Sequence, residues 1–344
     1  MSIFEKPILV RKLHKYIHQV KKQGGKILST PRQLVIDYTH LCNFKCSFCY
    51  ERTENTRTKE KLSLEEISRI ADEAHELGFV ELILQGGELL IKFKELLEII
   101  RAIKPERFKV ILMTNGVLID EEKISSLRAA GVDCIGVSLS TLDETEFEEK
   151  SGIKGSFAKV KNALELLSKS EITTWIQVIF GHHNSKSKDL FNLLDYAKEK
   201  NIGIYFILAM PYGIWKDNRL TNEDLEIFAE IRKKYNCFHD PWDEYDLEKK
   251  NNSGCIAGNR LFITPKGDVL PCPFIEISFG NIREKSLQEI YSFVMSNKWF
   301  SGHSSVCLAA QNFDFREKYL SEKYSCMNPN FAYNIFTIED FKNE

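Results

Sequence analysis

The hydrophobic positions of this chain fall into a repeated pattern, in which a short apolar run is followed by a longer stretch with helical periodicity. Each apolar run ends in polar or glycine residues before the helical stretch begins. Strands that alternate with helices of about ten residues or more predict right-handed β-α-β crossovers and a parallel sheet. Six such strands are predicted, at Leu34–Thr39, Phe79–Leu84, Phe108–Met113, Val132–Leu139, Ile172–Phe180 and Ile202–Ala209.

The helical stretches have recognisable boundaries. Ser63-Leu64-Glu65-Glu66 is a capping box for a helix that ends at Leu77. Further helices are predicted at 93–103, Asp120–Ala130, Ser156–Lys169, Lys188–Lys200 and Asn222–Tyr235.

A separate helix is predicted over residues 6–26, where Lys and Arg alternate with apolar residues until Gly24-Gly25. It could lie on a membrane or hold a peptide. A helix packed on the following domain with a solvated basic face is the favoured interpretation.

Three thiols lie just beyond the first predicted strand, at Cys42, Cys46 and Cys49. A compact loop with three thiolates can hold an iron–sulfur cubane and leave one iron without a protein ligand. The alternative is a structural zinc loop, but such sites usually pair two ligand elements and close all four positions. An iron–sulfur cluster is therefore favoured.

Composition narrows the classes of partner and compartment. The 344 residues include 47 Lys and Arg against 49 Asp and Glu, so bulk charge gives no indication of a nucleic-acid partner. No export signal and no run of about 18 apolar residues is found, so we expect a cytoplasmic protein without a membrane partner. The nine cysteines are an odd number, and in a reducing compartment clustered thiols favour metal binding over disulfides.

At the cysteine loop the sequence resembles the radical S-adenosylmethionine (radical SAM) superfamily, with Asn43 after the first cysteine and Phe48 before the third. A Gly86-Gly87-Glu88 segment after the second strand matches the glycine-rich motif of that family, although Leu89 replaces the usual proline. The resemblance implies an α/β fold with a partial (β/α)6 TIM-like barrel. It also implies a [4Fe–4S] cluster on Cys42, Cys46 and Cys49 whose open iron chelates S-adenosylmethionine (SAM). Reductive cleavage of SAM would yield a 5′-deoxyadenosyl radical.

The same resemblance implies contacts to SAM at the ends of the strands. Gly86, Gly87 and Glu88 would receive the amino group of SAM. Asn115, Ser138 and Ser140 would contact its ribose and carboxylate, and these residues also suit helix caps and turns. The chain around Phe48 and Tyr50 would pass near the adenine.

Two groups of polar residues could be either catalytic or merely solvated. His182 and His183 follow the fifth strand and are either a solvated pair or catalytic. An acidic and aromatic cluster at 239–246 is favoured as a linker, with a general base as the alternative. The residues that act as acid, base or hydrogen donor are not identified by the sequence.

A second cysteine set begins at Cys255, with eleven residues before Gly267 and four more before Cys272. Leu261–Thr264 and Val269-Leu270 read as a β-hairpin around a Pro265–Asp268 turn. The spacing resembles the SPASM or twitch extension of radical SAM enzymes, and the predicted helix Ser286–Trp299 agrees with it. The resemblance implies one auxiliary [4Fe–4S] cluster ligated by Cys255, Cys272, Cys307 and Cys326.

The remaining thiols are Cys134, which is expected in the core, and Cys237. Cys237 could be a hydrogen-atom donor or an auxiliary ligand, with an inert role favoured.

The chain is predicted to have four parts: a basic N-terminal helix (1–30), a radical SAM barrel (31–212), a linker with a helix (213–254) and a SPASM/twitch-like domain (255–344).

The functional expectation is a radical SAM oxidoreductase or maturase that abstracts hydrogen from a peptide, with an electron donor such as flavodoxin or ferredoxin. The runner-up is a dehydrogenase of a small polyol, aminosugar or cofactor precursor, because no leader-binding domain is recognisable and this counts against a large precursor. A non-catalytic metal-binding scaffold is the alternative of another class.

Overall fold

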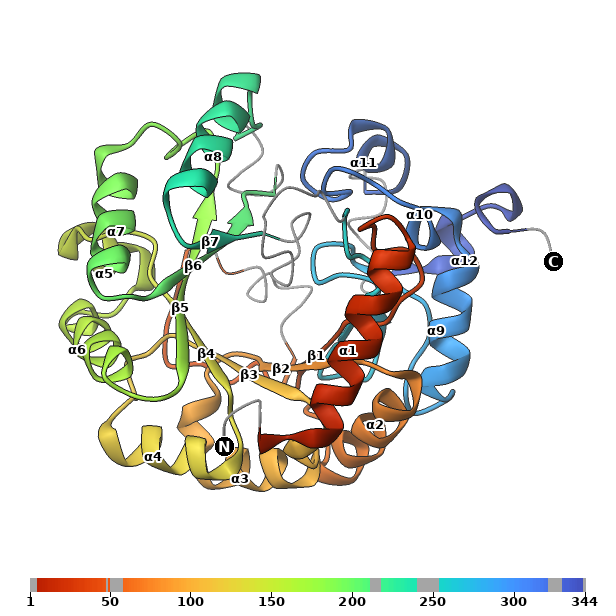
Figure 1. Ribbon diagram of the computed structural model, residues 1–344, viewed down its shortest axis with the longest axis horizontal. Coiled ribbons are helices and arrows are strands. Elements are labelled where there is room, and N and C mark those ends of the chain that lie inside the picture. The colour runs from red at the N-terminus through yellow and green to blue at the C-terminus, as the bar shows by residue number, and fades with distance from the viewer. Residues whose placement is uncertain are drawn as a thin grey trace.

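One curved parallel sheet organises the molecule. The computed structural model describes residues 5–47, 49, 58–210, 218–239, 254–320 and 330–342. Within these ranges nine strands form a sheet in the order β7-β6-β5-β4-β3-β2-β1-β8-β9. Neighbouring strands from β7 to β8 are all parallel, and β8 and β9 are antiparallel. Helices surround the outside of the sheet (Figure 1). The predicted partial α/β barrel is confirmed.

The bounds of the elements agree closely with the hydrophobic pattern. The strands are β1 (Gln33–Asp37), β2 (Glu81–Gln85), β3 (Lys109–Thr114), β4 (Cys134–Ser138), β5 (Thr173–Phe180), β6 (Gly203–Leu208), β7 (Cys237–Phe238), β8 (Arg260–Ile263), β9 (Val269–Leu270), β10 (Ile277–Ser278) and β11 (Asn330–Phe331). The helices are α1 (Pro7–Lys22), α2 (Leu64–Leu77), α3 (Phe93–Ala102), α4 (Glu121–Ala130), α5 (Glu144–Ser151), α6 (Ser156–Ser168), α7 (Lys188–Glu199), α8 (Asn222–Lys234), α9 (Leu287–Ser296), α10 (Lys298–Ser301), α11 (Phe313–Tyr319) and α12 (Ala332–Ile335). Short 3₁₀ turns occupy η3 (Leu89–Lys92), η4 (Pro105–Arg107) and η7 (Ile338–Asp340).

Burial on both faces of the strands explains their continuous apolar runs. Leu34 and Leu82 belong to the large core between the sheet and the outer helices. Val35 and Phe262 pack with Ile83 in a separate cluster inside the barrel. Since both faces are covered, the central residues of these strands form apolar runs rather than alternating in polarity.

Local capping sets several helix starts. The predicted capping box at Ser63 and Glu66 is present at the start of α2, and Asp120 caps α4 through its side chain. The sequence pattern missed α5, a short polar helix inserted between β4 and α6. Its first turn is capped by Asp143, which accepts a hydrogen bond from the backbone N–H of Glu146.

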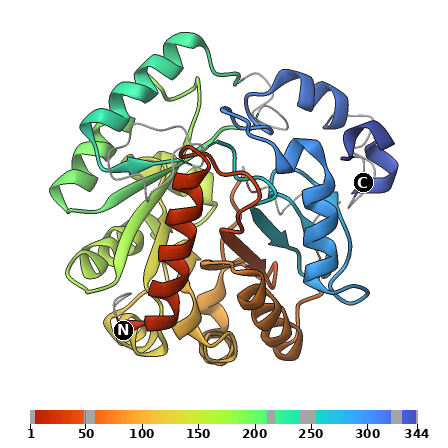
Figure 2. The same ribbon diagram turned by 45° about the vertical axis from the view of Figure 1, so that its right-hand side comes forward.

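The first helix, α1, covers the amino-terminal end of the barrel. It crosses in front of the sheet in Figures 1 and 2, drawn in red. Its buried residues Tyr16 and Val20 pack with Val80, which precedes β2. The predicted packing on the next domain is confirmed, but the basic face is only partly solvated. Lys6 is fully buried, and burial and the nearby Arg107 lower the pKa of Lys12 to about 7.

The predicted C-terminal hairpin forms, and it extends the barrel sheet itself. Phe262 of β8 pairs with Leu270 of β9 across a turn in which Gly267 has a φ of 88°. The other edge of β8 lies parallel to β1. Residues 255–270 and the barrel therefore share one sheet, while the predicted four-part division of the chain stays a prediction.

A buried polar network links β8 to β6 across the interior. The guanidinium of Arg260 donates to Gln33 Oε1 at 2.8 and 2.6 Å and to the Tyr205 hydroxyl at 3.3 Å. Gln33 Nε2 donates in turn to Glu81 at 2.5 Å. These side chains cross-link strands that are distant in the sheet order.

The C-terminal elements are anchored on α2. Arg69 donates to the carbonyl oxygen of Ile282 at 2.6 Å, and Glu73 accepts from the Leu287 amide at 2.5 Å. Arg283 donates to Glu66 at 2.6 Å. Figures 1 and 2 show α9, in blue, beside α2.

Among the described residues, no helix has the length and apolar character needed to span a membrane.

Candidate active site

The cysteine loop after β1 is held by the ends of two neighbouring strands. The amide of Gly87 donates to Thr39 O at 2.7 Å, and the amide of Glu88 donates to Leu41 O at 2.7 Å. Asn115, after β3, donates from Nδ2 to Asn43 Oδ1 at 2.8 Å. These contacts bring residues after β1, β2 and β3 together at the carboxyl edge of the sheet, where functional loops of α/β barrels lie.

The end of α5 holds the other side of the loop. The amide of Lys45 donates to Ser151 O at 2.9 Å, and that of Ser47 donates to Lys150 O at 3.0 Å. Phe44 is buried and makes an edge contact with Phe147 of α5. A helix that the sequence pattern missed therefore supports the loop carrying Cys42, Cys46 and Cys49.

The two glycines after β2 allow close backbone packing. A Cβ added to Gly86 would lie 2.5 Å from Thr39 O, and one added to Gly87 would lie 2.2 Å from Leu41 O. From the sequence, we predict that these glycines allow the backbone to approach a bound ligand closely. In the structure they allow the end of β2 to approach the cysteine loop, while their contact with SAM stays a prediction.

Glu88 is buried at the junction of the three strand ends. Its carboxylate accepts hydrogen bonds from the amides of Leu90 and Asn115 at 3.0 and 2.8 Å. The Thr114 hydroxyl lies 2.9 Å from both oxygens. Burial raises the pKa of Glu88, although these donors act in the opposite direction. The carboxylate thus positions Asn115, and its predicted role as acceptor for the SAM amino group is untested.

Replacing Glu88 with glutamine is expected to destabilise the fold by about 1–3 kcal/mol, because an NH2 group would face at least one of the buried donors. Urea unfolding followed by circular dichroism measures this change. Glu98→Gln is the matched control, since Glu98 is exposed on α3 and should change the free energy of unfolding by less than about 0.5 kcal/mol. Equal stability of the two variants would contradict the assignment.

The other predicted SAM contacts lie along the same edge. Asn115 is half-buried, Ser138 is exposed at the end of β4, and Ser140 is half-buried two residues later. Ser138 is paired across the sheet with Gln177 of β5. Phe48 and Tyr50 lie outside the described residues.

The structure gathers three thiols of the second cysteine set. A hydrogen bond with Cys255, burial and the nearby thiol of Cys272 raise the pKa of Cys307. Cys255 is held by its amide, which donates to Ser304 O at 2.7 Å, and Cys307 opens a turn closed by Gln311. Cys326, the fourth predicted ligand, lies outside the described residues.

Both donor sets fit iron–sulfur clusters by their chemistry. Among the described residues, no three His, Cys, Asp or Glu side chains already surround a common metal position. Cys42, Cys46 and Cys49 are half-buried in one short loop, and Cys255, Cys272 and Cys307 are close enough to interact. Thiols gathered in a buried site resist ionisation until a metal compensates their charge, which suits cluster ligands.

The two remaining cysteines lie in the core. Cys134 is 1% exposed in β4, and Cys237 is 3% exposed in β7 rather than in a linker. Their burial supports the inert roles that the sequence favoured.

The histidine pair has partners that the sequence did not indicate. His182 Nδ1 lies 2.8 Å from a carboxylate oxygen of Asp224, in the first turn of α8. His183 is held by Asn218, which accepts from its amide at 2.9 Å. The local sequence indicates only that Asp224 belongs to a Thr-x-x-Asp capping box at the start of α8, and not that it contacts His182. The 239–246 cluster is described only at His239, which is buried.

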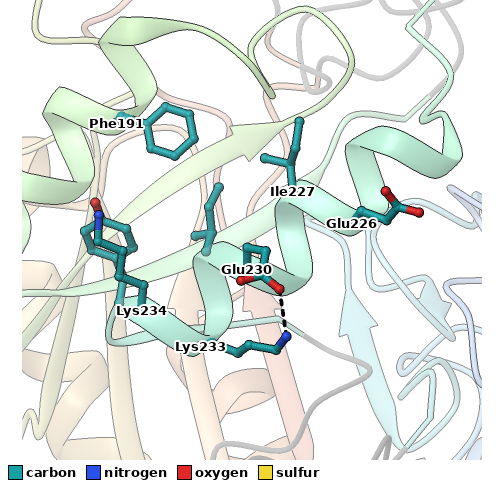
Figure 3. A pocket seen from close by; sticks show the side chains of 8 residues that line it. Phe191, Glu226, Ile227, Glu230, Lys233 and Lys234 are labelled. Atoms are coloured by element: carbon teal, nitrogen blue, oxygen red, sulfur yellow. Dashed lines mark hydrogen bonds and ion pairs between the residues drawn. The ribbon is translucent and has the colours of Figure 1, made fainter.

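A shallow groove lies elsewhere, on the outside of the barrel between α7 and α8 (Figure 3). Its apolar lining includes Phe191, Ile227 and Tyr235. Lys233 and Glu230 form an exposed ion pair of 2.7 Å at its edge. This groove is separate from the carboxyl edge that carries the cysteine loop.

Comparison with known proteins agrees with this geometry. A model of the radical SAM superfamily matches residues 36–197, and a model of an iron–sulfur cluster-binding domain, SPASM, matches residues 255–320. PqqA peptide cyclase of Granulibacter bethesdensis is 29% identical over 308 residues, which cover 84% of this chain and 81% of that protein. GTP 3′,8-cyclase of Clostridium perfringens is 28% identical, with 73% and 83% covered.

A similar fold occurs in the crystal structure of Streptococcus suis SuiB bound to the precursor peptide SuiA. The TM-score is 0.59 at 20% identity, with 81% of this chain and 68% of that chain covered. The cysteine loop, the parallel barrel that carries it and the second thiol group thus agree with both matched models. The chain therefore contains a radical SAM domain at residues 36–197 and a SPASM iron–sulfur cluster-binding domain at residues 255–320.

Proposed function

We propose that this protein is a peptide-modifying radical SAM enzyme, an oxidoreductase or maturase. The observation that carries the proposal is the cysteine loop, fastened to the glycine pair and Asn115 at the carboxyl edge of a parallel barrel. Cys42, Cys46 and Cys49 would hold a [4Fe–4S] cluster. When bound, that cluster supplies the electron that cleaves SAM to a 5′-deoxyadenosyl radical, which abstracts hydrogen from the substrate.

The chain's own residues would bind and orient SAM. The Glu88 carboxylate fixes the Asn115 amide, so Asn115 can present its side chain at a constant position beside the loop. Ser138 and Ser140 offer hydroxyl groups on the next strand end, suited to the ribose and carboxylate of SAM. Gly86, Gly87 and Glu88 remain the proposed contacts to the amino group, and Phe48 and Tyr50 those near the adenine.

A peptide substrate is supported by the relatives. The similarity to PqqA peptide cyclase extends over most of both chains, so it includes the SPASM-type region as well as the barrel. Similarity over both regions supports related roles for the barrel and the SPASM-type region in the two proteins. We extend the proposal to a reducing partner such as flavodoxin or ferredoxin, because the cluster must receive electrons.

A small-molecule substrate is the second candidate. It is supported by the comparable similarity to GTP 3′,8-cyclase, whose name gives a nucleotide rather than a peptide. The two candidates share the cysteine loop and differ in the class of substrate from which hydrogen is abstracted.

One auxiliary [4Fe–4S] cluster is proposed on Cys255, Cys272, Cys307 and Cys326. Replacing Cys307 with alanine should reduce the iron of the reconstituted protein from about eight to about four atoms per chain, because one cubane loses its ligand set. Iron and sulfide analysis with Mössbauer spectroscopy measures the loss. Cys134→Ala, a buried cysteine outside both sites, is the control and should retain all the iron. Full iron content in the Cys307 variant would exclude it as an essential ligand.

The proposed function is tested with anaerobically reconstituted protein, SAM and dithionite. Panels of peptides and metabolites deuterated at carbon are compared for deuterium transfer into 5′-deoxyadenosine. Transfer from a peptide and not from metabolites supports the maturase, and the reverse result supports the second candidate. No formation of 5′-deoxyadenosine under any condition would refute both.

A further inference from the structure

The loop after β5 carries two neighbouring histidines with different hydrogen-bond partners. More than half of the His182 side chain is exposed, and its Nδ1 lies 2.8 Å from Asp224 Oδ2. His183 is also exposed, and the Asn218 amide makes contacts with both its backbone N–H and its ring Nδ1, the latter at 2.5 Å. One imidazole is therefore held by a carboxylate, and the other by an amide.

Asp224 is built to remain ionised although its side chain is fully buried. It accepts hydrogen bonds from the Thr221 amide and hydroxyl, both at 2.7 Å, and from the Ser185 hydroxyl. It also lies in the first turn of α8, where the helix dipole favours a negative charge. These donors hold the pKa of Asp224 far below its usual range, despite burial.

These partners fix opposite tautomers in the two rings. Because Asp224 is a permanent acceptor, His182 must carry its proton on Nδ1, which leaves the lone pair on Nε2. Asn218 accepts the His183 amide through Oδ1 and therefore donates from Nδ2 to ring Nδ1, so His183 carries its proton on Nε2. His182 Nε2 is a proton acceptor on an exposed side chain, oriented as in other carboxylate–imidazole pairs.

The histidine loop belongs to the same barrel edge as the cysteine loop. Electrostatic interactions of His183 with Lys150 and Glu146 place it beside α5. The carbonyl oxygen of Lys150 accepts the amide of Ser47 in the cysteine loop at 3.0 Å. Only one short helix therefore separates the two loops.

We propose that His182, oriented by Asp224, is the catalytic base that accepts a proton from the substrate. The inference rests on the proposed function. A C–H hydrogen atom leaves the substrate to form 5′-deoxyadenosine, and a neighbouring N–H, O–H or S–H proton goes to His182 Nε2. The heteroatom and the carbon form the new bond, and an auxiliary iron–sulfur cluster, which Cys255, Cys272 and Cys307 would help to hold, would accept the one remaining electron. The substrate thus loses two hydrogens, and Asp224 stabilises the imidazolium.

The test measures the ratio of oxidised product to 5′-deoxyadenosine, since proton loss follows hydrogen abstraction. The probe is the deuterated peptide that passes the assay of the proposed function. His182→Gln retains a polar side chain but has no basic nitrogen, so the ratio should fall about 100-fold. Asp224→Asn favours the other tautomer and should reduce the ratio similarly, with its folding checked by urea unfolding.

Lys186→Ala is the matched control. Lys186 forms an exposed ion pair with Glu223 beside the histidine loop, and this variant should leave the ratio unchanged. The charged groups near His182 are Asp224, its direct partner, and the Lys186–Glu223 ion pair. Glu146 and Lys150 lie near the neighbouring His183.

A second measurement does not depend on the substrate. ¹⁵N-histidine spectra of the reconstituted protein with its clusters oxidised should show His182 protonated at Nδ1 and His183 at Nε2. An Nε2-protonated His182, or an unchanged ratio in His182→Gln, would overturn the inference. If no peptide transfers deuterium, the peptide proposal fails. The active metabolite then serves as the probe, and the spectra still decide the state of the dyad.

Discussion

Replacing Gly87 with alanine is expected to abolish cluster binding in the cysteine loop and, with it, SAM cleavage. The new Cβ would lie 2.2 Å from Leu41 O, 2.4 Å from Leu41 C and 2.9 Å from Cys42 N. All three are backbone atoms, so no side-chain rotation can relieve the overlap. The hydrogen bond from the Glu88 amide to Leu41 O, 2.7 Å long, holds the same contact and would be lost. Displacing the first cysteine removes one of three thiolates from a site that has no spare ligand.

Iron content after anaerobic reconstitution and the yield of 5′-deoxyadenosine measure this effect. Gly203→Ala in β6 is the matched control, because its Cβ would meet neighbouring atoms at 3.6 Å, an ordinary packing distance. It should retain the clusters and the activity, while both variants keep the circular dichroism of the folded barrel. A Gly87→Ala protein with full iron and activity would show that the glycine does not set the position of the loop.

Replacing Lys6 with alanine is expected to destabilise the protein by about 3–5 kcal/mol, the usual cost of leaving one member of a buried ion pair unpaired. The ammonium group is fully buried and donates to three acceptors, which uses all of its protons. These are Phe108 O at 3.1 Å, Gly131 O at 2.9 Å and Asp133 Oδ2 at 2.5 Å. Without Lys6, two carbonyl oxygens and a carboxylate at the amino-terminal end of β3 and β4 lose a donor.

The destabilisation should depend on pH. Burial already raises the pKa of Asp133, and loss of the ammonium removes a charge that opposes this shift. In the variant the folded protein therefore retains a proton that the unfolded chain releases, so stability falls as pH rises through the pKa of the folded state. The loss should be greater at pH 7.5 than at pH 5.

Urea unfolding at both pH values measures this prediction. Lys15→Ala, at an exposed position of the helix α1 that follows Lys6, should change stability by less than about 0.5 kcal/mol. Lys6→Met retains most of the packing of the stem, so an equal loss in this variant would assign the effect to the charge. A Lys6→Ala protein as stable as Lys15→Ala would contradict the buried pair.

Local sequence signals were sufficient for the elements and for the positions of the candidate ligands. The apolar runs located β1 to β6 because strands buried on both faces are apolar along their central residues. Ser63 and Glu66 located the start of α2 because a capping box involves residues only three positions apart. Two short apolar segments on either side of a Pro265–Asp268 turn located the β8–β9 hairpin, and Gly267 of that turn has a positive φ.

The same signals misjudged residues whose role depends on distant partners. Lys6 reads as one more basic residue of a solvated helix, yet it is buried against Asp133, 127 residues away. Asp224 reads as a helix cap, yet its carboxylate also orients His182, 42 residues earlier. α5 was missed because its sequence is polar and short, although its carbonyl groups hold the cysteine loop.

The sequence by itself determined the order of strands and helices, the radical SAM and SPASM motifs, and the two groups of cysteines, because periodicity and spacing act over a few residues. The tertiary structure alone decided that Gly87 packs on the backbone of Leu41, that β8 extends the barrel, and that His182 acquires Asp224. Such contacts join segments far apart in the chain, and their energy depends on burial and close approach, which no local pattern encodes.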